Sequence, residues 1–196
     1  MGDHNVIADV SEILLGVLQD AVRPLGTGEP YAVLDDLSGT VPTNPAKLSL
    51  FLYEIAEDPA SRNRACIRVD PIGDDPRTRV RKPPMALILR YLITAWGGNQ
   101  ITQHQMLGRA LEALYNDAIL TGSRLGKSLA GSTDSLHLTL TPLTLDQKSY
   151  VWFALQKPYR LSLNYEVRVV NLQAGERPGT GVVTGRALDS GRLREP

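Results

Sequence analysis

The sequence has a single cysteine, no excess charge of either sign and no long apolar run, and each absence excludes a class of protein. Cys66 alone cannot form an internal disulfide or a four-thiolate metal site, and one cysteine suits a reducing compartment. The 21 basic residues balance the 21 acidic ones, so the chain lacks the broad positive charge that draws proteins to nucleic-acid phosphates. No apolar run approaches the ~20 residues of a membrane-spanning helix, and the first residues lack the features of a signal peptide. We therefore expect a soluble, cytoplasmic protein that binds no nucleic acid and does not insert into a membrane.

The size and composition of the chain favour one ordinary globular domain. Of its 196 residues, 42% are hydrophobic and 21% are charged, which is close to the average for folded proteins. After Leu172 the chain is glycine-rich and has few large apolar residues, so this part cannot bury enough surface to fold alone. The sequence therefore predicts a folded domain over residues 1–172 and a flexible C-terminal arm over residues 173–196.

Apolar periodicity predicts a mixture of helices and strands. A helical stripe covers residues 6–21 and ends at Pro24 and Gly26. Two further helices are predicted behind Thr102 and Thr144, because each threonine is followed three residues later by a glutamine, as in a capping box. The buried stripe of the first of these is predicted to be Leu107, Ala110, Leu111, Leu114 and Ala118.

Strand patterns alternate with these helices. They cover residues 31–37, 47–55, 85–96, 136–141 and 161–169. The segment 57–84 is rich in proline and charge and is predicted to be mostly a surface loop, with a short strand near residues 67–69. The expected fold class is α+β, a mainly antiparallel sheet covered by helices.

Patterns associated with catalysis or nucleotide binding are weak. Residues 122–128 end in Gly-Lys-Ser like a phosphate-binding loop, but the first glycine is one position too close and a helix is predicted before it. No Gly-x-Ser-x-Gly elbow occurs. The remaining candidates are scattered histidines and aspartate pairs beside turns: His4, His104, His137, Asp35-Asp36 and Asp74-Asp75. We expect no catalytic, cofactor-binding or metal-binding residues; the alternative is a small enzyme whose site is assembled in space around His104, Cys66 or the aspartates.

Interface residues are better candidates than catalytic ones. Tryptophan is enriched at interface hot spots, although both tryptophans of this chain could equally be core residues. The basic run in residues 77–82 could meet an acidic partner, although nearby aspartates offset it and a solvated loop is the simpler interpretation. A β-branched pair in the arm could order against a neighbour. The candidate interface residues are Trp96, Trp152, Arg79, Arg81, Lys82, Val182 and Val183.

Several segments, taken together, resemble one known family. The first are Val-Ile-Ala-Asp-Val-Ser-Glu at residues 6–12, Leu-Ser-Leu-Phe-Leu-Tyr-Glu-Ile at 48–55 and Asp-Pro-Ala-Ser-Arg-Asn at 58–63. The next are Arg-Lys-Pro-Pro at 81–84, Tyr-Leu-Ile-Thr-Ala-Trp at 91–96 and His-Gln-Met-Leu-Gly-Arg-Ala-Leu at 104–111, and the last are 155–158, 160–163 and 165–169. Over residues 6–172 the chain is similar to the N-terminal domain of cap proteins from extracellular contractile injection systems, which are phage-tail-like particles.

This resemblance implies a tail-terminator-like fold and a structural role without an active site. A terminator forms a ring of six copies at the end farthest from the baseplate, stops inner-tube polymerisation and holds the last sheath layer. The implied partners are further copies of this chain, the inner tube protein and the sheath protein, and a second cap protein stays an open possibility. The implied location is the cytoplasm, within an assembled particle with which the cap can be released. The alternative is a tail-completion or connector subunit of a phage-like apparatus.

Overall fold

The computed structural model describes residues 4–25, 31–61, 65–69, 79–81, 83–130, 135–172 and 177–178, and it divides the chain into two compact units. The larger unit comprises Met1–Asn63 and Pro84–Gln173, and the smaller comprises Arg64–Pro83 and Ala174–Pro196. The smaller unit thus contains most of the segment predicted as a loop together with most of the predicted arm. Most of residues 173–196 lie outside the described part, so a flexible arm stays a prediction.

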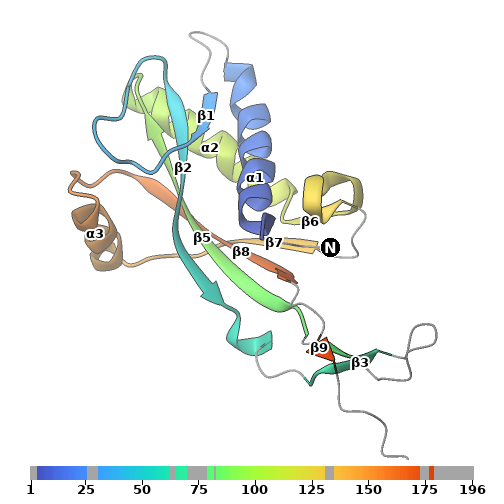
Figure 1. The fold of residues 1–196 in the computed structure, drawn as a ribbon. Coiled ribbons are helices and arrows are strands. Elements are labelled where there is room, and N and C mark those ends of the chain that lie inside the picture. The colour runs from blue at the N-terminus through green and yellow to red at the C-terminus, as the bar shows by residue number, and fades with distance from the viewer. Residues whose placement is uncertain are drawn as a thin grey trace, which may run out of the picture. The chain divides into compact units, whose positions relative to one another are not determined.

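The larger unit is a six-stranded sheet with three helices (Figure 1). Its strands, in the order in which they lie side by side, are β1 (Tyr31–Leu34), β2 (Lys47–Glu57), β5 (Met85–Trp96), β8 (Ser162–Leu172), β7 (Ser135–Leu140) and β6 (Ile119–Thr121). Its helices are α1 (Val6–Val22), α2 (Gln100–Asn116) and α3 (Leu145–Ala154), and single 3-10 turns cover Arg23–Leu25, Pro59–Ser61, Gly122–Arg124 and Lys127–Leu129. Only β1 pairs parallel to its neighbour, β2. The predicted α+β class with a mainly antiparallel sheet is confirmed.

Helices α1 and α2 lie side by side over one face of the sheet, which we call the first face (Figure 1). The apolar stripe of α1 points to the sheet with a period of four residues, as a helix with one buried face requires. Its buried members are Val6, Val10, Leu14, Leu18 and Val22. They pack on alternate residues of the central strand, Leu87, Leu89, Tyr91, Ile93 and Ala95. The main core of the larger unit therefore lies between this helix pair and the first face.

The start and the buried face of α2 differ from the prediction. The helix is capped by Asn99, whose side chain accepts a hydrogen bond from the backbone N–H of Thr102 at 2.8 Å, so the predicted capping box at Thr102 is wrong. Met106 is buried on this helix, whereas Leu111 is 38% exposed. Since Met106, Ala110 and Leu114 face the core, Leu111 lies at the edge of the packed face. The capping box at Thr144, by contrast, is confirmed at the start of α3.

The strand predictions are confirmed where the periodic signal is long. β5 spans the predicted residues 85–96, and β8 extends the predicted run by three residues to Leu172. β6 was not predicted, and it has only three residues, Ile119–Thr121. It follows that a strand precedes Gly122, contrary to the expected helix, and that a 3-10 turn covers Lys127–Leu129, where a phosphate-binding loop would lead into a helix.

The smaller unit contains a three-stranded antiparallel sheet in the order β3-β4-β9. Its strands are β3 (Ile67–Val69), β4 (Arg79–Arg81) and β9 (Arg177–Pro178). β3 was predicted, but β4 and β9, of three and two residues, were not. The prediction of a mostly unstructured loop over residues 57–84 is therefore corrected at β4. Among the helices in the described part of the chain, none is long and apolar enough to cross a membrane.

A buried hydrogen bond between α1 and the central strand provides a test of this packing. Ser11 Oγ and Tyr91 Oη lie 2.8 Å apart, and Ser11 also donates to the carbonyl of Ile7, so the phenol of Tyr91 is the donor to Ser11. Burial raises the pKa of Tyr91 to about 12. In the unfolded chain a tyrosine ionises near pH 10. Between these values the unfolded state releases its proton first, so stability should fall as pH rises.

We expect the free energy of unfolding of Tyr91→Phe to fall less steeply between pH 10 and 12 than that of the unchanged chain, because the contribution of Tyr91 is gone. For one ionising group this contribution is at most about 1.4 kcal/mol per pH unit. Below pH 10 the same change should cost about 0.5–1.5 kcal/mol, because one buried hydrogen bond is lost. Urea unfolding at several pH values between 8 and 12 measures both effects. An unchanged alkaline slope in the variant would show that Tyr91 is not protected from ionisation by the fold.

Candidate functional site

The second face of the sheet, opposite α1 and α2, is only partly covered. Because side chains alternate along a strand, the residues of β5 that do not face the helix pair point to this side. Near one end of β5, helix α3 and an aromatic cluster cover these residues. Toward the middle of the sheet, the second face carries polar and charged side chains. This face is the candidate functional site, since it carries charged and polar side chains that take no part in the apolar core.

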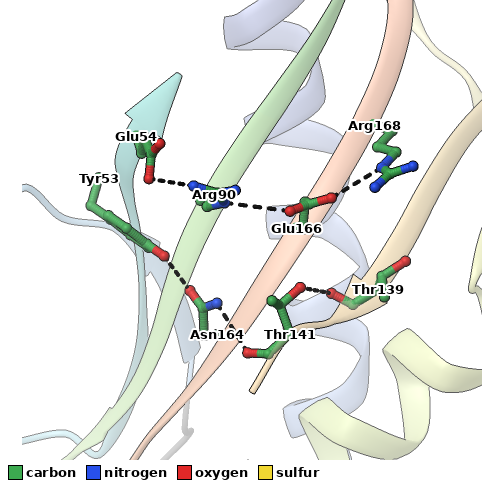
Figure 2. Close-up of polar contacts among 8 residues, drawn as sticks. All are labelled: Tyr53, Glu54, Arg90, Thr139, Thr141, Asn164, Glu166 and Arg168. Atoms are coloured by element: carbon green, nitrogen blue, oxygen red, sulfur yellow. Dashed lines mark hydrogen bonds and ion pairs between the residues drawn. The ribbon is translucent and has the colours of Figure 1, made fainter. Parts of the chain in front are cut away.

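A β-bulge in β2 brings two consecutive residues to this face. The pairing of β2 with β5 shifts between Leu52 and Glu54, so Tyr53 has no single partner on β5. A bulge of this kind inserts one extra residue and turns the side chains that follow it. As Figure 2 shows, Tyr53 and Glu54 both point toward the neighbouring strands on the same side.

Four charged side chains form a row across three strands (Figure 2). Glu54, Arg90 and Glu166 are direct cross-strand partners on β2, β5 and β8. Arg90 Nη1 donates to Glu54 Oε2 at 2.7 Å, and its Nε donates to Glu166 Oε2 at 3.4 Å. Arg168 Nε donates to the other oxygen of Glu166 at 3.0 Å. The hydrogen bond to Glu54 is the main reason that the pKa of Arg90 is raised, so Arg90 stays protonated near neutral pH.

A second row, built from neutral groups, runs beside the first. Tyr53 Oη donates to Asn164 Oδ1 at 2.6 Å, and Asn164 Nδ2 donates to the carbonyl of Thr141 at 3.1 Å. The hydroxyl of Thr141 lies 3.5 Å from the carbonyl of Thr139 (Figure 2). Burial is the main reason that the pKa of Tyr53 is raised, so its phenol stays a neutral donor. Together the two rows tie β2, β5, β8 and β7 to one another through their side chains.

The groups of this face satisfy one another, and this decides what the face can do. The carboxylates accept from arginines, and the phenol of Tyr53 is held neutral by burial. The two rows make a polar surface with balanced charge.

Both predicted tryptophans belong to the aromatic cluster beneath α3. Trp96 and Trp152 are 4% and 1% exposed, and their rings meet edge to face with centroids 6.2 Å apart. Trp96 Nε1 donates to Ser49 Oγ at 2.7 Å, and the guanidinium of Arg160 lies 4.5 Å from the centre of the Trp96 ring. Both tryptophans are therefore core residues in the single chain, one of the two alternatives that the sequence left open, and their contact anchors α3. A role as interface anchors stays a prediction.

The other candidate residues are scattered. Arg79 and Arg81 lie on β4 of the smaller unit, whereas Lys82, Val182 and Val183 lie outside the described residues, as do Asp74 and Asp75. Asp35 forms an ion pair with Lys47 and accepts from the backbone of Leu37, and Asp36 accepts from Ser38, a contact that lowers the pKa of Asp36. These aspartates shape a turn, as expected.

The histidines and Cys66 lie on separate segments of the described structure. Ser135 Oγ lies 2.8 Å from His137 Nε2, but both residues are on one exposed stretch of β7. Cys66 is exposed near β3. In the part of the chain that the structure describes, no group of three or more His, Cys, Asp or Glu side chains could hold a metal ion.

Sequence analysis missed the residues that dominate this site. Arg90 is the single charged residue of the apolar strand β5, and Glu166 lies on the polar side of β8, both at positions that alternate with the core. This alternation could have predicted that both side chains lie on the face of the sheet opposite the core. Glu54 could not have been assigned to the same face from the sequence, because the bulge at Tyr53 interrupts the alternation of side chains along β2.

Comparisons with known proteins agree with this fold. The family described as the Pvc16 N-terminal domain matches residues 9–185, which includes part of the predicted arm. A solved structure titled as the sheath/tube terminator of the extracellular contractile injection system PVC, in the extended state, has a TM-score of 0.62 at 22% identity and covers 100% of this chain. The cap of the anti-feeding prophage, titled as a tube terminating cap, has a TM-score of 0.62 at 24% identity and covers 93%.

These likenesses show the fold, and the expectation of a tail-terminator-like architecture is confirmed. The chain spans 66% and 60% of those two proteins, less than two thirds of each. No curated protein shows significant sequence similarity to the chain.

The charged row on the second face can be tested through its central residue. We expect Arg90→Met to lower the free energy of unfolding by about 1–3 kcal/mol, because Glu166, whose side chain is 10% exposed, loses one of its two arginine partners. Arg109→Met is the matched control, since Arg109 forms an exposed pair with Glu112 and should cost less than about 0.5 kcal/mol. Equal losses in the two variants, measured by urea unfolding, would show that the row contributes no more than a surface ion pair.

Proposed function

This chain belongs to the Pvc16 N-terminal domain family, and on that premise we propose that it caps the tube and sheath of a contractile injection system. In this role it ends polymerisation of the inner tube and holds the last sheath layer. The observation that carries the proposal is the family match over residues 9–185, which spans segments of both compact units. The two similar structures, a sheath/tube terminator and a tube terminating cap, support the same role.

The proposed cap acts as a ring of identical subunits, six by the resemblance of its sequence. Its partners are further copies of this chain, the inner tube protein and the sheath protein, and a second cap protein can share the same end of the particle. A ring requires a contact between two different surfaces of each subunit, repeated until it closes. The stiff sheet of the larger unit supports this role, because its face is tied by side chains across four strands.

We propose a structural role without catalysis, cofactor, nucleic acid or direct insertion into a membrane. The balanced charge of the chain and the mutual pairing of Glu54, Arg90 and Glu166 support this view. The cap is assembled in the cytoplasm as part of the particle and leaves the cell with it.

The arm has a proposed part in assembly. β9, from the start of the arm, pairs with β4, which carries Arg79 and Arg81. We propose that residues 173–196 form a C-terminal arm that orders, through Val182 and Val183, against a neighbouring subunit or the last sheath layer. Arg79, Arg81 and Lys82 are proposed as contacts of the same smaller unit.

The terminator role can be tested with purified components. Added to growing inner tubes, the full chain should bind their ends and shorten the mean tube length as its proportion rises. Tube lengths measured by negative-stain electron microscopy test this, with a chain unfolded by heat as the control. A connector subunit would bind without stopping growth, so end-bound chains on tubes of unchanged length would contradict the terminator role.

The role of the arm can be tested by truncation. A chain ending at Leu172 loses β9 and the residues behind it, and we expect fewer particles to carry a cap. A chain ending at Gly179 retains β9 and separates the effect of the strand from that of the remaining arm. Full cap occupancy with the shorter chain, scored by electron microscopy, would show that the arm is dispensable.

A further inference from the structure

An apolar groove opens on the first face of the sheet, at the edge of the packed face of α2. It has a cavity volume of about 360 Å³. Its lining includes Gly108, Leu111 and Tyr115 from α2, Leu138 and Leu140 from β7, and Tyr165 from β8. Tyr115 is 80% exposed and Leu140 is 48% exposed, so apolar side chains of the groove face solvent in the single chain. Exposed apolar surface of this kind commonly marks a contact with another protein.

Gly108 lines the groove at a position where the chain itself has no need of glycine. It lies inside α2, where glycine destabilises a helix by about 1 kcal/mol relative to alanine. A Cβ atom at this position would meet no atom within 4 Å, so the packing of the chain itself does not require glycine here. Glycine at a helix surface permits close approach of another backbone or of a bulky side chain.

A second exposed apolar surface lies on the outer side of α3. Tyr150 and Phe153 are 73% and 81% exposed, although Trp152 between them is buried. A hollow of about 410 Å³ lies beside Phe153, lined by Phe153, Ala154, Gln156 and Lys157. Each of the two surfaces therefore consists of a protruding aromatic residue next to a hollow, Tyr115 on α2 and Phe153 on α3.

The two surfaces lie on opposite sides of one sheet. The groove is lined by residues of the first face, whereas Trp152 fixes α3 to the second face through Trp96. Within a single chain the outer side of α3 does not line the groove. We propose that the outer side of α3, led by Phe153, docks into the α2–β7 groove of a second copy of this chain.

This contact is of the kind that builds rings. It joins two different surfaces, so it repeats head to tail and closes when the rotation between neighbours allows. Two aromatic residues, Tyr115 and Phe153, enter hollows of the partner and supply the buried anchors on which interfaces commonly depend. The inference rests on the proposed cap function, and it identifies the surfaces that join neighbouring subunits of the ring.

Cross-linking between single-cysteine chains tests the contact directly. Cys66 is exposed and is first replaced by serine. Full-length chains carrying Tyr115→Cys and Phe153→Cys are then mixed and treated with a short bismaleimide, both in solution and in assembled particles. We expect mixed 115–153 dimers to be the main product, and Ile55→Cys, an exposed position on β2, is the control that should not form them.

Products joining 115 to 115 or 153 to 153 would overturn the proposal, since they indicate a symmetric contact. Absence of the mixed product from particles that carry a visible cap would also overturn it, while leaving the cap function intact. Particles without a cap would instead contradict the proposed function.

A pair of glycine variants tests the reason for the groove. Gly108→Ala should raise Tm by about 2–4 °C, because the helix is stabilised, yet weaken self-association about tenfold, because the methyl group crowds the docked helix. Gly16→Ala on α1 is the matched control, since a Cβ there also meets nothing within 4 Å. It should raise Tm equally and leave association unchanged. Equal association of both variants, measured by analytical ultracentrifugation, would show that Gly108 is not part of a contact between copies.

Discussion

The central strand β5 is buried on both of its faces, and the rest of the larger unit depends on this constraint. Its residues alternate between two environments. Leu89, Tyr91 and Ile93 pack under α1 and α2, while Leu92 and Trp96 pack under α3. On the second face, Arg90 is the charged residue of β5, and its partners Glu54 and Glu166 lie on the same face. A strand in this position forces its neighbours β2 and β8 into register, since a slip of one residue would place Arg90 in the core.

This register accounts for the division of the molecule into a stiff body and outward-facing surfaces. The ion pairs of Arg90 and the hydrogen bonds of Asn164 extend across the same strands, so the uncovered part of the second face is held by side chains as well as by the backbone. The surfaces that we propose for contacts between copies lie away from that region, along α2 and α3.

How much could be predicted from the sequence depended on whether the signal was local. α1, β5 and β8 carry long periodic patterns, and the structure has them near the predicted residues. The capping boxes at Thr102 and Thr144 have the same spacing, yet only the second is real, because Asn99 offers α2 an earlier cap. The pairing of β4 with β9 joins residues almost a hundred positions apart, and no local pattern predicts it. The candidate site was missed for the same reason, since Glu54, Arg90 and Glu166 meet only through the register of three strands.

The central claim is that this chain closes the end of a contractile particle. The most direct measurement is electron microscopy of particles from cells with and without the chain, scoring particle length and the end distal to the baseplate. The account predicts lengthened, uncapped or unstable tubes without the chain, and a ring at that end when the chain is supplied again. Particles of normal length with an intact cap in its absence would contradict the account.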